Sequence, residues 1–202
     1  MPYKTIVIDR EYASGGREIG KKLSEKLGVP LYDSALLIEA SKRFGYSLDT
    51  IKSFDEKLGS RWLDYIINDS IFMTTDQTMV DPSFEVFQIM EKTITALSAE
   101  GPCIFMGRCA DFILKKAGNV VSVFVYASDK SDKLKRAVNV DHIPESQANG
   151  YIMKTDKQRS KYFNLFTGQE WGNRANYDLC LNTSTLGYDL CAEVIGELYI
   201  RR

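Results

Sequence analysis

Five short apolar runs, separated by segments with helical periodicity, constrain the fold more than any other feature of the chain. The runs lie at 5–8, 29–33, 103–106, 120–126 and 177–182, and the first of them is β-branched throughout. They do not follow one another as alternating hairpins, and each intervening segment includes a predicted helix. Parallel strands require such crossovers, which place helices on both faces of the sheet. The sequence therefore predicts an α/β fold with a five-stranded parallel sheet between two helical layers.

Helical periodicity predicts helices in the segments between the runs. Ile19, Leu23 and Leu27 repeat every four residues, and Gly28 follows as a natural C-cap, which predicts a first helix ending at 27. The stretch after the second run is helical throughout, with helices expected at 36–44, 47–53, 58–71 and 84–99. Further helices are expected at 110–116, 130–140, 145–163 and 190–199. The 202 residues are expected to form a single domain.

Charge and hydropathy exclude several classes of partner. Lys and Arg number 26 against 27 Asp and Glu, so a net charge of −1 gives no general attraction to nucleic acid or anionic membranes. No apolar stretch approaches the roughly 18–20 residues of a membrane span, and the N-terminus lacks the apolar core of a signal peptide. These features predict a cytoplasmic protein with neither nucleic-acid nor membrane partners, and they leave its oligomeric state undetermined.

The cysteines and the single histidine also limit the chemistry. The four cysteines are scattered without CxxC spacing, so a disulfide framework or a zinc site is not expected. Cys180 lies in an apolar run and is expected in the core. His142 is the only histidine, which excludes histidine-rich metal sites and argues against a Ser-His-Asp triad.

A glycine-rich turn, Ser14-Gly15-Gly16-Arg17-Glu18, lies between the first strand and the first helix. The first amides of a helix have no intrahelical acceptor, the helix dipole is positive there, and glycines allow an anion to approach the backbone. Arg17, on the first turn, can neutralise phosphate oxygens. The turn therefore predicts a site for a nucleoside triphosphate. The alternative is a glycine turn that only begins a helix.

A second register of the phosphate-loop pattern GxxxxGK[ST] is also present, with Gly20-Lys21 as its Gly-Lys pair. This register conflicts with the apolar stripe of the first helix, which places Gly20 and Lys21 inside the helix rather than on the loop. Arg17 is therefore the better candidate for the phosphate-binding cation. No Ser or Thr follows Arg17 to hold Mg²⁺.

Three longer segments raise the specificity of this interpretation: REYASGGREIGKKLSEKLGVPLYDSALL, GPCIFMGRCADFIL and YFNLFTGQEWGNRANYDLCLNTSTLG. Together they resemble the cytidylate-kinase-like family, a branch of the P-loop nucleoside monophosphate kinases. The resemblance covers nearly the whole chain in the same order, except about 47–83. It implies one P-loop domain over 1–202, with its core at 1–35, 99–139 and 167–202. A helical acceptor-binding insertion is implied at 36–98 and a small lid at 140–166.

The resemblance can be carried over at matching positions. Arg17 falls where these kinases have the phosphate-loop lysine, and Asp33-Ser34 matches the Asp-Ser that opens the acceptor-binding segment. Gly107-Arg108 resembles the Gly-Arg after the third strand, whose arginine reaches the monophosphate acceptor. Asp156 and Arg159 resemble the D-x-x-R of the lid, where arginines close over the phosphates.

Combined, these observations assign the expected site. Donor binding is expected from Ser14, Gly15, Gly16, Arg17, Glu18 and Arg136. Acceptor binding is expected from Asp33, Ser34, Arg43 and Arg108. The expected catalytic residues are Arg17, Arg108 and Arg159.

Each assignment has a structural alternative. Arg108 could pair with Asp111, and Asp33 could only cap the next helix. Arg136 and Arg159 lie in basic segments that could be solvated helix faces. Arg43 could only complement a helix dipole.

The resemblance implies ATP-dependent transfer of a phosphoryl group to a nucleoside monophosphate, with CMP or dCMP as the first expectation. Arginine forks suit such a reaction, because both substrates carry negative charge. Mg²⁺ is expected with the nucleotide, without an assigned protein ligand. Two alternatives remain: a kinase for another small acceptor, and a catalytically silent nucleotide-binding or regulatory module, which the missing Lys and Ser/Thr favour.

Overall fold

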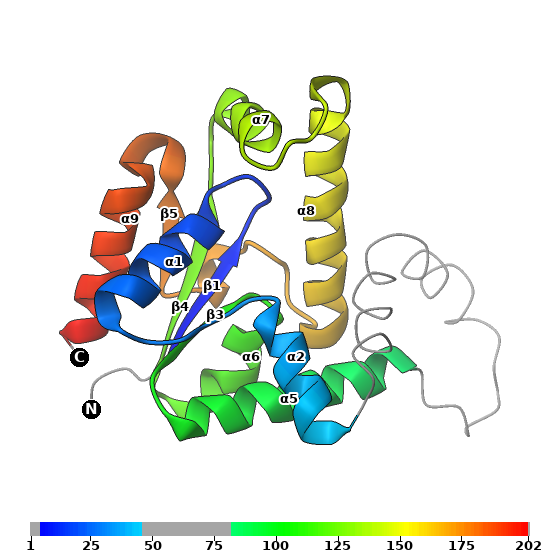
Figure 1. Ribbon diagram of the computed structural model, residues 1–202, viewed down its shortest axis with the longest axis vertical. Coiled ribbons are helices and arrows are strands. Elements are labelled where there is room, and N and C mark those ends of the chain that lie inside the picture. The colour runs from blue at the N-terminus through cyan, green and yellow to red at the C-terminus, as the bar shows by residue number, and fades with distance from the viewer. Residues whose placement is uncertain (1–4, 46–81, 202) are drawn as a thin grey trace.

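A computed structural model describes residues 5–45 and 82–201, and within them five strands form one parallel sheet (Figure 1). The strands are β1 (Thr5–Arg10), β2 (Leu31–Tyr32), β3 (Cys103–Met106), β4 (Val120–Tyr126) and β5 (Leu179–Asn182). Their order across the sheet is β2-β3-β1-β4-β5, and every neighbouring pair is parallel. The predicted α/β class and parallel sheet are confirmed. The helices expected at 47–53 and 58–71 lie outside the described residues.

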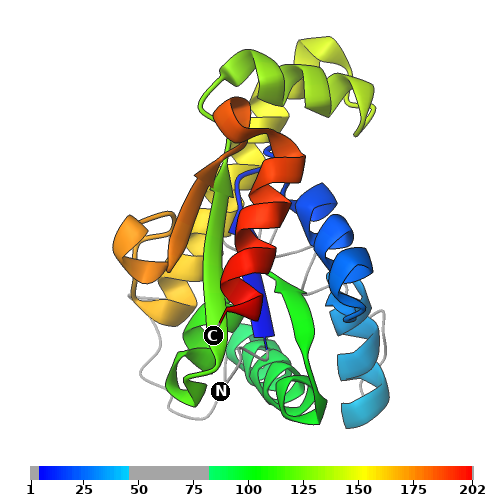
Figure 2. The ribbon, with the colours of Figure 1, turned by 90° about the vertical axis from the view of Figure 1, so that its left-hand side faces the viewer.

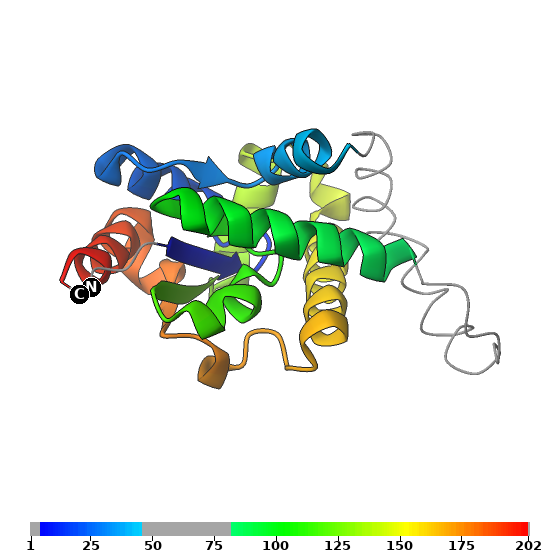
Figure 3. The ribbon, with the colours of Figure 1, turned by 90° about the horizontal axis from the view of Figure 1, so that it is seen from below.

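Helices cover both faces of the sheet. The longer ones are α1 (Gly16–Leu27), α2 (Ala35–Phe44), α5 (Pro82–Glu100), α7 (Lys130–Asn139), α8 (Glu145–Thr167) and α9 (Thr183–Ile200). A short helix, α6 (Ala110–Leu114), follows β3, and single 3₁₀ turns occupy Lys115–Ala117 and Arg174–Asn176. Figure 2 shows α1 and α9 side by side over one face, and Figure 3 shows α5 between α2 and α6.

Side-chain alternation along β1 explains why the sheet has a core on each face. Ile6 and Ile8 pack with α1 and α9, whereas Val7 packs with α2, α5 and α6. All three side chains are fully buried. A strand whose two faces are both covered is apolar at nearly every position, which is why the first run shows no polar alternation. The three-layer α/β/α arrangement predicted for the chain is therefore confirmed.

Two details differ from the sequence-based expectation. The last helix begins at Thr183 rather than 190, because the side chain of Asn182 accepts a hydrogen bond from the Ser184 amide and caps it there. A non-helical Gly187 then interrupts the helix. Cys180 is exposed rather than buried, because β5 is an edge strand and only one of its faces is covered.

The carboxyl end of β1 leads into the glycine-rich turn, and α7 and α8 pack against that turn. Ala137, Ala148 and Ile152 form a small apolar cluster with Tyr12 and Ala13. In Figure 1, α7 and α8 lie at the top and right of the sheet, beside this end of β1. Within the described residues, no helix is both long enough and apolar enough to cross a membrane.

Candidate functional site

The turn between β1 and α1 is held in place by its own polar groups. The Ser14 hydroxyl lies 2.8 Å from the Glu11 carbonyl oxygen and 3.1 Å from that of Val125, so it is engaged within the protein. The Thr183 hydroxyl donates to the Ser14 carbonyl at 2.9 Å, which ties the turn to α9. Gly15 has a left-handed φ of 84° and caps α1 without a side-chain hydrogen bond. The start of α1 is therefore fixed in position and its first amides have no side-chain cap.

Gly15 also has a steric reason to be glycine. A Cβ atom at this position would lie 2.2 Å from a ring carbon of Tyr188, which packs against the turn from α9. Gly20 and Lys21 lie inside α1, so the register that places the phosphate-binding lysine at Lys21 is excluded, as the sequence indicated.

A buried lysine joins the turn to α7 and α8. Lys133 donates to Glu11 Oε2 at 3.1 Å and to Asp156 Oδ2 at 2.8 Å. The other oxygen of Asp156 accepts from the Tyr12 amide at 2.5 Å. Lys133 is 8 % exposed, and burying an ammonium group requires such carboxylate partners. The triad positions α8, and hence Arg159 one turn further along, against the turn.

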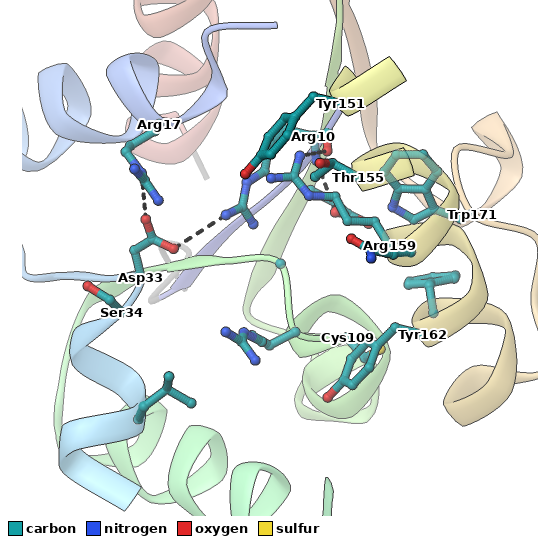
Figure 4. Close-up of a pocket in the computed structure, with 16 residues that line it drawn as sticks. Arg10, Arg17, Asp33, Ser34, Cys109, Tyr151, Thr155, Arg159, Tyr162 and Trp171 are labelled. Atoms are coloured by element: carbon teal, nitrogen blue, oxygen red, sulfur yellow. Dashed lines mark hydrogen bonds and ion pairs between the residues drawn. The ribbon is translucent and has the colours of Figure 1, made fainter. Parts of the chain in front are cut away.

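A cavity of about 470 Å³ opens beside the turn, between α2, the end of β3 and α8 (Figure 4). We call it the arginine cavity, because four arginines line it: Arg10, Arg17, Arg108 and Arg159. Its acidic lining consists of two aspartates, Asp9 and Asp33. Four guanidinium groups against two carboxyl groups give it an excess of positive charge, although the whole chain is nearly neutral.

Asp33 is shared by two of these arginines. Its Oδ2 atom lies 2.7 Å from Arg17 Nε, and its Oδ1 atom lies 3.3 Å from Arg10 Nη2. Figure 4 shows the carboxylate between the two guanidinium groups. Arg159 donates to the carbonyl oxygen of Arg10 at 2.8 Å, so a third arginine closes the group from α8.

Burial shapes the ionisation of this group. Burial and the neighbouring charge of Arg159 lower the pKa of Arg10 to about 10, which leaves Arg10 charged at neutral pH. Burial likewise lowers the pKa of Arg159. Burial raises the pKa of Asp9, whose oxygens accept from the Arg10 amide and the Tyr177 hydroxyl. A site with partly desolvated cations favours an incoming anion.

The backbone after β3 is strained where it enters the cavity. Gly107, Arg108 and Cys109 have consecutive left-handed φ values of 68°, 63° and 58°. Non-glycine residues adopt this conformation at a cost of about 1–3 kcal/mol each, and they persist where the surrounding structure enforces them. The turn places Arg108 in the lining of the cavity rather than along the strand direction.

A second cavity, of about 450 Å³, lies on the other side of the turn and is called here the α7–α9 cavity. Its lining includes Glu18, Arg136, Thr183, Ser184 and Tyr188. Arg136 pairs with Glu18 at 3.0 Å, and its guanidinium carbon lies 5.0 Å from the centre of the Tyr188 ring. Although burial opposes it, hydrogen bonding to Tyr188 and Glu18 raises the pKa of Arg136. The turn thus separates the cationic arginine cavity from the α7–α9 cavity, which contains an aromatic ring and an arginine paired with a carboxylate.

The structure brings most of the predicted site residues to these two cavities. Arg17, Asp33, Ser34, Arg108 and Arg159 line the arginine cavity, and Glu18 and Arg136 line the α7–α9 cavity. Ser14, Gly15 and Gly16 lie in the turn between them.

Arg43 is held outside the arginine cavity: its guanidinium group binds both oxygens of Glu100, at 2.6 and 3.0 Å.

Two residues of the site were missed by sequence reasoning. Arg10 lies outside the predicted run at 5–8, but β1 continues through it and its side chain lines the cavity. Lys133 was grouped with the basic face of its helix, but it is buried. Side chains alternate between the two faces of β1, which places Arg10 on the same side of the sheet as α1. This alternation was the one sequence signal that pointed to a position for Arg10 near the turn.

The arrangement fits a nucleoside triphosphate better than a dedicated metal site. An uncapped helix start, glycines and several guanidinium groups are suited to phosphates. Glu18, which stands where a metal-binding hydroxyl is expected, is paired with Arg136. In the described part of the chain, no group of three or more His, Cys, Asp and Glu side chains could hold a metal ion. The pairing of Glu18 with Arg136 leaves no dedicated side-chain ligand for Mg²⁺ at that position of the turn.

Comparisons with known proteins agree with this geometry. A crystal structure of an uncharacterized protein from Eubacterium ventriosum is similar, with a TM-score of 0.66, 24 % identity, and coverage of 98 % of this chain and 99 % of that one. Shikimate kinase from Bacteroides thetaiotaomicron is similar at 12 % identity, with a TM-score of 0.53 and 96 % of each chain covered. At these identities the likeness shows the fold, which is that of P-loop kinases.

A search of curated proteins found no match. The model of the cytidylate kinase-like family matches residues 5–185, which include the turn, the end of β3 and the whole of α8. The predicted family resemblance is confirmed. The chain therefore belongs to the cytidylate kinase-like family.

Proposed function

We propose that the protein transfers the γ-phosphoryl group of ATP to a nucleoside monophosphate, with CMP or dCMP as the preferred acceptor. The observation that carries the proposal is the convergence of four arginines on one cavity beside the uncapped start of α1. Family membership supports nucleotide binding and phosphoryl transfer in general.

The two cavities divide the substrates in this proposal. The donor triphosphate lies along the turn, where the amides at the start of α1 and Arg17 hold its phosphates. Its base lies in the α7–α9 cavity, near Arg136 and Tyr188. The acceptor phosphate lies in the arginine cavity, near Arg108 and Arg159. Asp33 and Ser34 contact the acceptor from the start of α2.

Positioning and charge neutralisation supply most of the catalysis in phosphoryl transfer. The acceptor phosphate is already an anion at neutral pH, so its oxygen attacks without a general base. The arginines reduce the repulsion between the two phosphate groups and stabilise the charge that develops on the transferring oxygens. Mg²⁺ would accompany the nucleotide and neutralise part of its phosphate charge, with no residue of the described chain assigned as its ligand. Because α8 closes over the turn, it also limits the access of water.

A coupled assay of ADP formation tests the proposal, with CMP, dCMP, UMP, AMP and non-nucleotide alcohols as acceptors. We expect the largest kcat/KM with CMP or dCMP. Turnover with a non-nucleotide alcohol alone would remove the nucleoside monophosphate from the proposal.

One observation favours a second candidate, a kinase for a small hydroxylated acceptor. The carboxylate of Asp33 lies in the arginine cavity, and a hydroxyl acceptor needs a proton acceptor that a phosphate acceptor does not. The same assay distinguishes the two candidates. Replacing Asp33 by Asn should abolish turnover of an alcohol but only weaken the binding of a monophosphate.

A silent nucleotide-binding module is the third candidate, because Arg17 and Glu18 replace the usual Lys and Ser/Thr. Calorimetry with ATP, combined with the acceptor assay, decides it. Tight ATP binding without transfer to any acceptor would establish the silent module and contradict the kinase.

A further inference from the structure

Arg10 occupies a channel that two glycines leave open. It is the last residue of β1, and its side chain passes under the start of α1. A Cβ on Gly16 would lie 2.7 Å from Arg10 Cβ, and a Cβ on Gly107 would lie 2.6 Å from Arg10 Nη1. Both distances are shorter than real Cβ contacts. Gly16 belongs to the donor turn and Gly107 to the acceptor side, so the side chain of Arg10 spans the boundary between them.

The guanidinium of Arg10 is fixed at that boundary. Its side chain is 14 % exposed, and Nη2 contacts Asp33 Oδ1 at 3.3 Å. Its backbone is held on both sides, since the amide donates to Asp9 and the carbonyl accepts from Arg159. Figure 4 shows the Arg10 side chain reaching from β1 toward Asp33. Little side-chain entropy remains to be lost when such a group binds a ligand.

Arg17 contrasts with Arg10 in each of these respects. Its side chain is 64 % exposed, and its guanidinium group pairs with Asp33 at the cavity edge of α2's start. An exposed ion pair contributes about 0–1 kcal/mol, because water screens it and a flexible side chain must be ordered. The position in the sequence that matches the usual lysine is therefore not the position where the structure holds a buried cation.

We propose that Arg10, and not Arg17, is the principal cation that contacts the transferred phosphoryl group. Before substrate binds, the Asp33 carboxylate pairs with Arg10 in place of that group. This inference rests on the proposed function and names a catalytic residue for it. The terminal phosphate of the donor displaces the Asp33 carboxylate from Arg10. The terminal phosphate is a better partner for the Arg10 guanidinium than the carboxylate, because it bears more negative charge and can accept two parallel hydrogen bonds from it.

The bond between the γ-phosphorus and the β,γ-bridging oxygen breaks, and ADP leaves with that electron pair on the bridging oxygen. A bond forms between the γ-phosphorus and an oxygen of the acceptor monophosphate, which supplies its own electron pair. No proton and no further reactant are required. Arg10 contacts the equatorial oxygens of the group in transit and remains protonated throughout.

The test compares two substitutions at the site with one outside it. Arg10→Gln and Arg17→Gln each remove one guanidinium group from the site. Arg201→Gln is the control, because Arg201 is exposed, directly follows α9 and pairs with Glu197 of that helix. The affinities for ATP, ADP and tripolyphosphate are measured by calorimetry, and kcat is measured with CMP. Thermal melting verifies that each variant is folded.

We expect Arg10→Gln to lower kcat by at least about 100-fold and to remove the preference for ATP over ADP, since Arg10 contacts the terminal phosphate. Arg17→Gln should lower turnover or triphosphate affinity by about tenfold and leave that preference in place. Arg201→Gln should match the wild type. An Arg10→Gln protein that keeps both the preference and kcat would overturn the inference, and so would a larger loss from Arg17→Gln.

Two further variants keep the test decisive if Arg10→Gln does not fold. Arg10→Lys retains the charge without the fork, and Gly107→Ala retains Arg10 but places a Cβ 2.6 Å from Nη1 and so displaces the guanidinium group. Both should lower the ATP-to-ADP affinity ratio, and an unchanged ratio in both contradicts the inference. Failure of the proposed function has a different signature: the wild-type protein itself would bind neither ATP nor tripolyphosphate, and both proposals would then be overturned.

Discussion

The two cavities on either side of the turn are similar in volume but differ in how their charges are satisfied. In the arginine cavity, Arg10 and Arg17 share one carboxylate, and four guanidinium groups face two aspartates. In the α7–α9 cavity, Arg136 has its own carboxylate partner, Glu18, and lies over the ring of Tyr188. The first cavity is therefore short of anions. In the second, the two cations Lys135 and Arg136 are matched in number by Asp132 and Glu18, and the ring of Tyr188 forms part of the lining.

This difference indicates which part of a nucleotide suits each cavity. A phosphate contributes the negative charge that the arginine cavity lacks. A flat, uncharged base can pack against a ring or a guanidinium plane without adding charge. In the proposed assignment, a single turn of backbone between the two cavities separates the recognition of phosphate charge from the recognition of the base. The following substitutions test that division, from the largest expected effect to the smallest.

Arg159→Gln should have the largest effect among them, because Arg159 lines the arginine cavity and also donates to the Arg10 carbonyl. We expect kcat to fall by about 100-fold or more, as for other groups that stabilise transition-state charge. Steady-state kinetics with CMP measures it. Lys157→Gln, an exposed change on the same helix, is the matched control and should have no effect. Equal activity of the two variants would mean that α8 brings no catalytic charge to the cavity.

Arg108→Gln should act mainly on the acceptor. Its strained backbone places it in the lining of the arginine cavity, and it is not part of the lining of the α7–α9 cavity. We expect the KM for CMP to rise by about 10–100-fold, since a charge-assisted hydrogen bond contributes about 1.5–3 kcal/mol. The KM for ATP should change by less than about threefold. A rise confined to the KM for ATP would reverse the assignment of the two substrates.

Arg136→Ala should weaken ATP binding by about tenfold, or 1.4 kcal/mol, through the loss of base contacts in the α7–α9 cavity. The affinity for tripolyphosphate, which has no base, should be unchanged. Calorimetry with both ligands measures the difference. If both affinities fell equally, Arg136 would be a phosphate ligand, and the division between the two cavities would not hold.

The buried carboxyl group of Asp111 allows a test by pH. Burial and the charge of Asp9 raise the pKa of Asp111 to about 7, and one oxygen of this side chain is buried without a partner in the structure. The folded protein then keeps a proton that the unfolded chain releases, so stability falls as pH rises from about 4 to 7.

Asp111→Asn should remove this fall in stability with rising pH. Relative to the wild type, the variant should gain stability as pH rises through this window, by at most about 1.4 kcal/mol per pH unit, and the gain should level off above pH 7. Urea denaturation of both proteins at pH 5 and pH 8 measures it. A difference that is the same at both pH values would show that Asp111 is ionised in the folded protein.

The sequence predicted the scaffold well because its signals are local. The apolar runs, the apolar stripe of Ile19, Leu23 and Leu27, and the capping Gly28 each reflect the element in which they lie. The start of α9 was misplaced because one cap, Asn182, outweighed a weakly apolar first turn. Cys180 was misassigned because an apolar run does not reveal which strand lies at the edge of the sheet.

The sequence predicted only part of the site, because some of its residues are recognisable from the family resemblance and others depend on contacts between distant segments. Positions carried by the family resemblance, such as Arg108 and Arg159, lie at the cavity. Arg10 was missed because its role depends on Gly16 and Gly107, which approach it only after the strands have paired. The pairing of Arg43 with Glu100 is equally non-local, since 57 residues separate them.

The most direct test of the division between the cavities is a crystal structure with a non-hydrolysable ATP analogue and CMP. We predict that the triphosphate follows the amides of Gly15 and Gly16 and that its terminal phosphate contacts Arg10. The base of the analogue should lie in the α7–α9 cavity and the phosphate of CMP near Arg108. A nucleotide base in the arginine cavity, or a terminal phosphate bound to Arg17 with Arg10 still paired to Asp33, would contradict the account.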